Sequence, residues 1–183
     1  MRWRRLQKGF DPARLVFIDE SAAKTNMTRL RGRAERGLRV HSSAPLGHWK
    51  TTTMISAVRR DGSTACMAVD AATDTEVFRT YVEQVLCPWL HPGDLVVMDN
   101  LSPHKSEPTL LLIKAAGADV LFLPAYSPDL NPIEKMWSKV KQALRSSEAR
   151  DQESLIRAIG LALASVTPHD AMNWFASCGY SII

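Results

Sequence analysis

Three short apolar runs, each about the length of one strand, most constrain how this chain can fold. They are Leu15–Ile18, Leu95–Met98 and Val120–Leu123. Runs of this length, bounded by polar residues, are typical of buried strands, whereas a buried helix needs a longer pattern. The first two runs are followed directly by acids, Asp19 and Asp99. The sequence therefore predicts a sheet in which two strands end at carboxylates.

Between these runs, β-prone and helical patterns alternate. Thr51–Val58 and Thr64–Val69 are rich in β-branched residues, and the Asp-Gly pair within Arg59–Gly62 predicts a hairpin between them. Apolar residues recur at helical spacing in residues 77–86, 107–116, 133–144, 151–166 and 171–176. Strands interleaved with helices predict an α/β fold, with a mixed sheet flanked by helices.

Several helix ends carry their own signals. Thr73 and Glu76 have the spacing of a capping box, and Pro88 is expected to end the helix that follows. Gly117 is expected to end the next helix, and Thr167–Asp170 predicts the start of the last one.

The size and composition of the chain fit one domain spanning residues 1–183. It is 45% hydrophobic and 23% charged, enough for an ordinary core. No apolar run approaches the roughly 20 residues that cross a bilayer, and MRWRRLQKGF lacks the apolar segment of a signal peptide, so we expect no membrane partner. The three cysteines, Cys66, Cys87 and Cys178, predict neither a disulfide framework nor a zinc site. A reducing cytoplasm is the expected location.

Positive charge is concentrated near the start of the chain. Residues 1–60 carry 14 Lys or Arg against 4 acids, a net +10, whereas residues 61–183 carry 9 against 15, a net −6. Beyond a basic extension at residues 1–13, the densest part is a predicted flexible loop at residues 24–41. Such a segment attracts polyanions such as DNA, although a solvated surface would explain it equally well. The candidate DNA-binding residues are Lys24, Arg29, Arg31, Arg33, Arg36 and Arg39.

Glu134 is the third candidate acid, and two roles are open for it. Asn131 as N-cap, Pro132 at the first helical position and Glu134 at the third form a helix-start signature without any chemistry. However, Glu134 also begins a polar face that continues with Ser138, Lys141 and Arg145, beside the apolar stripe of that helix. An acid followed by two cations on one face suits a site that holds both a metal and a phosphate backbone.

A divalent metal follows from bringing the three acids together. Loops beyond the carboxyl ends of strands are where ligands gather in open α/β sheets, and Asp19 and Asp99 are predicted there. Three clustered carboxylates repel one another unless a cation neutralises them. Oxygen ligands favour Mg²⁺ or Mn²⁺ over zinc, and two ions about 3.5–4 Å apart suit phosphodiester displacement.

Three segments resemble the catalytic segments of DDE transposases, specifically the bacterial insertion-sequence branch of the mariner superfamily. They are FIDES around Asp19, VVMDNLSPHK around Asp99 and LPAYSPDLNPIEKMW around Glu134. The 34 residues between Asp99 and Glu134 match the spacing typical of that branch. KTNMTRLRGRA, GHWKTTTMISAVRRDG and NWFASCGY are also similar, so the resemblance runs from about Ala13 to Tyr180.

The resemblance implies a ribonuclease H-like fold, similar to retroviral integrase, with a five-stranded sheet. Asp19, Asp99 and Glu134 would be the catalytic metal ligands, on the first strand, the fourth strand and the following helix. Water would then attack a phosphodiester at a transposon end, and the liberated 3′-hydroxyl would attack target DNA. Asn100, His104 and Asn131 would lie behind the metal ligands or contact DNA. For His104 a structural hydrogen bond, and for Asn131 a role in shaping the turn, are the alternatives.

The resemblance also implies partners. These are transposon ends and target DNA, contacted in part by Lys141 and Arg145, and a homodimer or higher assembly on DNA in the bacterial nucleoid. Relatives usually carry an amino-terminal helix-turn-helix region, so a separately encoded half is expected to supply it. The alternative is a truncated, non-catalytic DNA-binding remnant that dampens transposition. A structure-specific nuclease of the same fold has no further support in the sequence.

Overall fold

A five-stranded sheet forms the centre of the computed structural model, which describes residues 2–41 and 43–180. The strand order is β3-β2-β1-β4-β5. The antiparallel part consists of β1 (Leu15–Lys24), β2 (Thr51–Arg59) and β3 (Thr64–Val69). On the other side of β1, parallel to it, lie β4 (Leu95–Met98) and β5 (Asp119–Phe122). The predicted mixed sheet and the hairpin are confirmed.

Strand β1 is longer than its apolar run predicted. The prediction ended the strand before Asp19, but β1 continues to Lys24 because β2 pairs with it as far as Lys24 opposite Thr51. Strand β4 pairs only with Leu15–Phe17. Asp19 therefore lies within β1, just beyond the part that β4 covers, and Lys24 belongs to the strand rather than to the basic loop.

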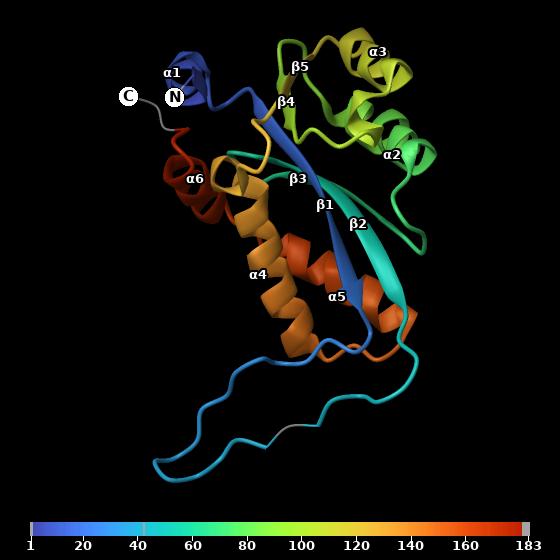
Figure 1. Cartoon of the computed structure of the whole chain (residues 1–183), viewed down its shortest axis with the longest axis vertical. Helices are drawn as coiled ribbons and strands as arrows, with labels where there is room; N and C mark the ends of the chain where they lie inside the picture. Colours follow the sequence, from blue (N-terminus) through green and yellow to red (C-terminus); the bar gives the residue numbers. More distant parts are fainter. Residues whose placement is uncertain (1, 42, 181–183) are drawn as a thin grey trace.

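Helices cover both faces of the sheet (Figure 1). One face packs against α4 (Pro132–Ser147), α5 (Gln152–Ala164) and α6 (Pro168–Ser177), in a core that includes Phe17 and Trp137. The other face packs against α2 (Thr75–Tyr81) and α3 (Glu107–Ala115), with Ile18 and Phe78 in its core. Successive side chains of β1 thus alternate between two separate cores, as the pleat of a strand requires.

Two predictions about helix ends are wrong. Asp74, rather than Thr73, caps α2, because its side chain accepts a 2.8 Å hydrogen bond from the Val77 N–H. After α2 the helical path continues through a π-helical turn, Val82–Leu86, and a 3₁₀ turn, Cys87–Trp89. Pro88 lies inside that last turn instead of ending the helix before it. A proline at the start of a turn has no N–H bond to lose.

The other helix ends agree with the sequence. Gly117 follows α3 with φ +83°, a left-handed conformation that glycine adopts without strain. Thr167 and Asp170 form a capping box at the start of α6. Asp151 and Ser154 form another at the start of α5.

The basic amino-terminal extension is folded against the other end of the chain. It contains α1 (Arg2–Leu6) and a 3₁₀ turn, Gln7–Gly9. Trp3 Nε1 donates to the Tyr180 hydroxyl at 3.1 Å, and that hydroxyl donates to the Leu130 carbonyl at 2.8 Å. Gln7 Nε2 donates to the Cys178 carbonyl at 2.8 Å. Both ends of the described chain therefore lie together (Figure 1).

A long loop, residues 25–50, joins β1 to β2 and extends away from the body of the molecule (Figure 1). Its base is closed by the Thr25 N–H, which donates to the Lys50 carbonyl at 3.1 Å, and by the Lys50 N–H, which donates to Thr25 Oγ1 at 3.1 Å. The predicted loop at residues 24–41 is thus part of a longer one. None of the helices in the described ranges is long and apolar enough to cross a membrane.

Candidate active site

The pairing of β1 with β4 brings Asp19 and Asp99 to the same edge. Phe17 lies opposite Val97 in this parallel pair, and each acid follows two residues later. Residues two apart on a strand face the same side, and Phe17 and Val97 both belong to the core under α4. The register therefore directs Asp19 and the start of the Asp99 loop toward α4.

Glu134 is brought to this edge by the packing of α4. The helix buries the predicted stripe of Ile133, Met136, Trp137, Val140 and Leu144 against the sheet. Glu134, one residue along from Ile133 in the first turn, is left exposed beside that stripe. The sequence prediction of which face is buried is confirmed, and it places Glu134 at the border between α4 and the sheet.

Asn131 does not cap α4 with its side chain, contrary to the prediction. Its backbone carbonyl accepts from the Glu134 N–H at 3.2 Å, but no side-chain cap hydrogen bond forms. The side chain is only 5% exposed, and its Oδ1 has no hydrogen-bond partner in the described part of the chain. The Glu134 N–H, which a side-chain cap could bind, already donates to the backbone carbonyl of Asn131.

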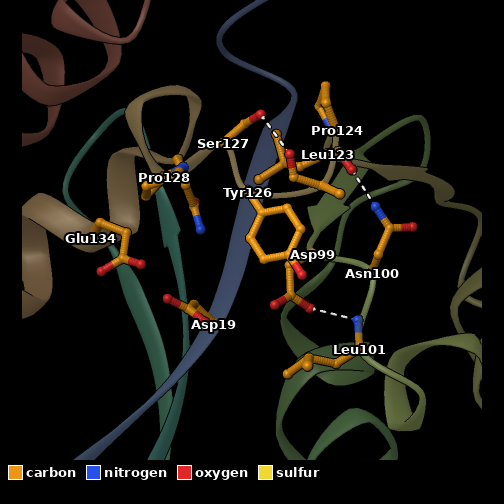
Figure 2. A pocket seen from close by; sticks show the side chains of 12 residues that line it. Asp19, Asp99, Asn100, Leu101, Leu123, Pro124, Tyr126, Ser127, Pro128 and Glu134 are labelled. Carbon is orange, nitrogen blue, oxygen red and sulfur yellow. Dashed lines mark hydrogen bonds between the residues drawn. The ribbon is translucent and has the colours of Figure 1, made fainter.

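The three acids line one open cleft of about 380 Å³. Figure 2 shows Glu134 reaching it from α4, Asp19 from β1 and Asp99 from the end of β4. The rest of its lining comes from the segment after β4, the turn before α4 and Asn131, as Asn100, Leu101 and residues 123–128. Three acids that are far apart in the sequence are thus collected in one cavity.

Asp19 lies in surroundings that disfavour its charged form. Burial, together with the negative charges of Glu134, Glu20 and Asp99, raises its pKa to about 7, although the Glu20 N–H, which donates to Asp19 Oδ1 at 2.9 Å, works in the opposite direction. Near neutral pH a large part of this carboxyl is therefore protonated unless a cation lies close by.

Asp99 has the opposite surroundings because of His104. Burial works against its charged form, but His104, the Leu101 N–H and Lys105 together lower the pKa of Asp99. His104 is fully buried in a 3₁₀ turn, Pro103–Lys105, with Nδ1 2.7 Å from Asp99 Oδ1 and Nε2 2.9 Å from Glu20 Oε1. Although burial lowers it, these two carboxylates raise the pKa of His104 to about 9.

The structure places His104 behind Asp99 rather than at the surface. Its ring is fully buried, and its centre lies 4.3 Å from that of the Phe78 ring. Its role toward the metal ligands stays a prediction. Sequence reasoning missed its second partner, Glu20. The available signal was the Asp-Glu pair in FIDES, because adjacent strand residues face opposite sides of a sheet. Asn100, also predicted behind the ligands, donates from Nδ2 to the Leu123 carbonyl and ties the loop after β4 to the end of β5.

The predicted DNA-binding residues lie on the loop after β1 and on α4, and the structure brings only some of them together. Arg29 and Arg31 share a hollow with Ser138 and Arg145 of α4. Lys24 Nζ lies 5.6 Å from the centre of the Trp49 ring. Arg33, Arg36 and Arg39 are exposed on the loop, and Lys141 is half-buried on α4. Their binding of DNA stays a prediction.

The side chains that line the cleft fit a hard divalent cation, because they offer carboxylate, amide and hydroxyl oxygens and include no histidine or cysteine. In the described ranges, no group of three or more His, Cys, Asp or Glu is already drawn together as a metal cage. A cation would have to draw the three carboxylates closer.

Residues 14–156 match the family model of the DDE superfamily endonucleases. The chain belongs to this family. It is 32% identical to the Tcb2 transposase of Caenorhabditis briggsae over 85 residues, which are 44% of this chain and 31% of that protein.

Solved structures of the Mos1 transposase share the fold. The paired-end complex with the left transposon end has a TM-score of 0.71 and 16% identity over 96% of this chain and 55% of that one. The mariner Mos1 paired-end complex with Mg has a TM-score of 0.72 and 17% identity over 98% of this chain and 60% of that one. The predicted ribonuclease H-like fold is confirmed. The chain spans about a third of the length of Tcb2 and somewhat over half of the Mos1 chains.

Proposed function

We propose that this chain is the catalytic domain of a DDE transposase, which cleaves DNA at transposon ends and joins them to target DNA. The observation that carries the proposal is the convergence of Asp19, Asp99 and Glu134 in one cleft of a DDE-family fold. The 34 residues between Asp99 and Glu134 support the bacterial insertion-sequence branch of the mariner superfamily. A member of that branch would act at the bacterial nucleoid. A homodimer on DNA and a helix-turn-helix half belong to the same proposal.

The metal ligands would be Asp19, Asp99 and Glu134, with Mg²⁺ or Mn²⁺ as the ions and two as their number. Mos1 has been solved with Mg, and the three carboxylates of this cleft suit the same kind of ion. When bound, such ions activate the attacking oxygen and stabilise the leaving oxygen of a phosphodiester.

The chain's own residues prepare the site unequally. His104 holds Asp99 from behind and favours its charged form, so this carboxylate is ready to bind a cation. Burial and the neighbouring acids favour the protonated form of Asp19, and a bound cation would favour its charged form instead. Glu134, exposed on the first turn of α4, completes the set from the helix side.

The basic residues of the loop at residues 25–50 and of α4 would hold the DNA. Arg29, Arg31 and Arg145 line a hollow beside the polar face of α4, and that face leads to Glu134. Phosphate contacts of this kind position a duplex without reading its sequence. We therefore assign to the loop and α4 the task of guiding the strand into the cleft.

The experiment is a nicking assay on supercoiled plasmid with residues 1–183 in Mg²⁺. The wild-type chain should nick the plasmid, and Asp99→Asn, which keeps the shape of the side chain, should not. Asp119→Asn, an exposed acid at the start of β5, is the matched control and should nick normally. No nicking by the wild-type chain that still binds DNA would favour the non-catalytic remnant instead.

A further inference from the structure

Tyr126 stands out at the mouth of the cleft because it contributes nothing to the core. It lies between β5 and α4, and its side chain is fully exposed, at 103% of the reference area. Its φ is +54°, in the left-handed region that residues other than glycine and asparagine rarely adopt. No packing within the described fold therefore compensates for the exposed ring or for the left-handed backbone of Tyr126.

The position of Tyr126 indicates that its ring serves the cleft rather than the core. Its side chain lines the same cleft as the three acids (Figure 2). Pro124 and Pro128 restrict the backbone on both sides of it, so the segment presents the ring rather than letting it fold away. Leu101, from the loop after β4, also lines the cleft and is 50% exposed. Apolar groups thus stand beside carboxylates in a cavity open to solvent.

A nucleotide fits both the acids and the apolar side chains of the cleft. Its phosphate would lie at the acids, and its base is the flat part with apolar faces. Bases stack on exposed aromatic side chains with little dependence on sequence. Away from the ends of a duplex each base face is covered by its neighbours, so there a base can lie against Tyr126 only when it is unpaired and has left the stack.

We propose that Tyr126 stacks on a base unpaired from the duplex next to the scissile phosphate, and so keeps that phosphate in the cleft. This inference rests on the proposed function, since it needs a DNA strand at Asp19, Asp99 and Glu134. It adds a property of the substrate: the DNA is locally opened where it is cut. Leu101 would contact the same nucleotide from the other loop.

The test compares two DNA probes, a fully paired 30-base-pair duplex and the same duplex with a central three-base mismatch, by fluorescence anisotropy at fixed salt in Ca²⁺. The wild-type chain should bind the mismatched probe about 5-fold to 100-fold more tightly, the range that stacking on one aromatic residue supplies. Tyr126→Asn should lose this preference. Asparagine tolerates the left-handed backbone, so this variant keeps the fold. Tyr126→Phe, which keeps the ring, should retain the preference.

Leu161→Ala is the matched control, since Leu161 is an apolar side chain 69% exposed on α5. It should leave the preference unchanged. An equal preference in wild type and Tyr126→Asn, in a protein that nicks plasmid in Mg²⁺, would overturn this inference and leave the proposed function standing. A change in oligomeric state without a change in preference would also overturn it, and would place Tyr126 in a contact between protein chains. A wild-type chain that neither binds nor nicks DNA would overturn both.

Discussion

At the scale of single residues, the site holds two aspartates in opposite electrostatic surroundings. Asp19 lies among uncompensated acids, and burial raises its pKa to about 7. Asp99 touches the buried His104, whose own partner is Glu20, and its pKa is lowered. One carboxylate is thus charged before a cation arrives, and the other becomes fully charged only near neutral pH or with a cation beside it. Metal affinity should therefore rise as the pH passes through about 7.

Asp19→Asn should raise the melting temperature of the metal-free protein at pH 8. Because the folded-state pKa of Asp19 lies above its usual value of 3.8, its stabilising contribution is present at low pH and is lost as the pH rises through about 7. Asparagine mimics the protonated form and avoids that loss, and each kcal/mol gained is worth about 2–4 °C in a chain of this size. Thermal melts at pH 4 and pH 8, without metal, measure this.

The difference should shrink at pH 4 and after addition of Mg²⁺. Asp119→Asn removes an exposed acid far from these neighbours and should melt like the wild-type protein at both pH values. A lower melting temperature for Asp19→Asn at pH 8 would mean that burial and the neighbouring acids do not disfavour the charged form of Asp19.

At the scale of elements, the loop at residues 25–50 meets the polar face of α4 where Arg29 and Arg31 line a hollow with Arg145. Replacing Arg29, Arg31, Arg33 and Arg36 with alanine should flatten the salt dependence of duplex binding. If each contacts one phosphate, the slope of log K against log salt should change by about 3.6. Binding titrations between 50 and 200 mM salt measure it. An unchanged slope would place the DNA path elsewhere on the molecule.

The turn before α4 depends on a different element, the docked chain ends. Tyr180 is 2% exposed, and its hydroxyl accepts from Trp3 and donates to the Leu130 carbonyl. Tyr180→Phe would leave an N–H and a carbonyl buried without partners, so it should lower the free energy of unfolding by about 1–3 kcal/mol. Urea denaturation measures the loss. Tyr126→Phe, which removes an exposed hydroxyl, is the control and should cost nothing measurable.

The elements also show where sequence reasoning succeeded and where it stopped. Apolar runs and turn signals predicted the strands, and the stripe on α4 predicted the buried face that positions Glu134, because burial leaves a local pattern. Strand β1 was predicted too short, since its second half is held by pairing with β2 and carries polar residues. The contact of Glu20 with His104 joins segments that are distant in the sequence, and so does the burial of the Asn131 side chain, which makes no cap. No local pattern in the sequence records such contacts.

At the scale of the whole molecule, the sheet separates two cores, and residues that face each of them contribute to the site. Asp19 faces the α4 side, whereas its neighbour Glu20 faces the α2 side and binds His104. The acids are therefore fixed by both cores, although the cleft itself is open. We therefore expect these three carboxylates together, and no single one of them, to form one site for divalent ions.

Isothermal titration of Mn²⁺ into residues 1–183 at pH 8 tests that claim without any DNA or activity. The wild-type chain should bind Mn²⁺ in the cleft, and Asp19→Asn, Asp99→Asn and Glu134→Gln should each weaken binding at least about tenfold, because each removes a charged oxygen ligand. Glu148→Gln, which removes an exposed acid at the far end of α4, should bind like the wild-type chain. Wild-type affinity in a protein that carries all three cleft substitutions would contradict the account.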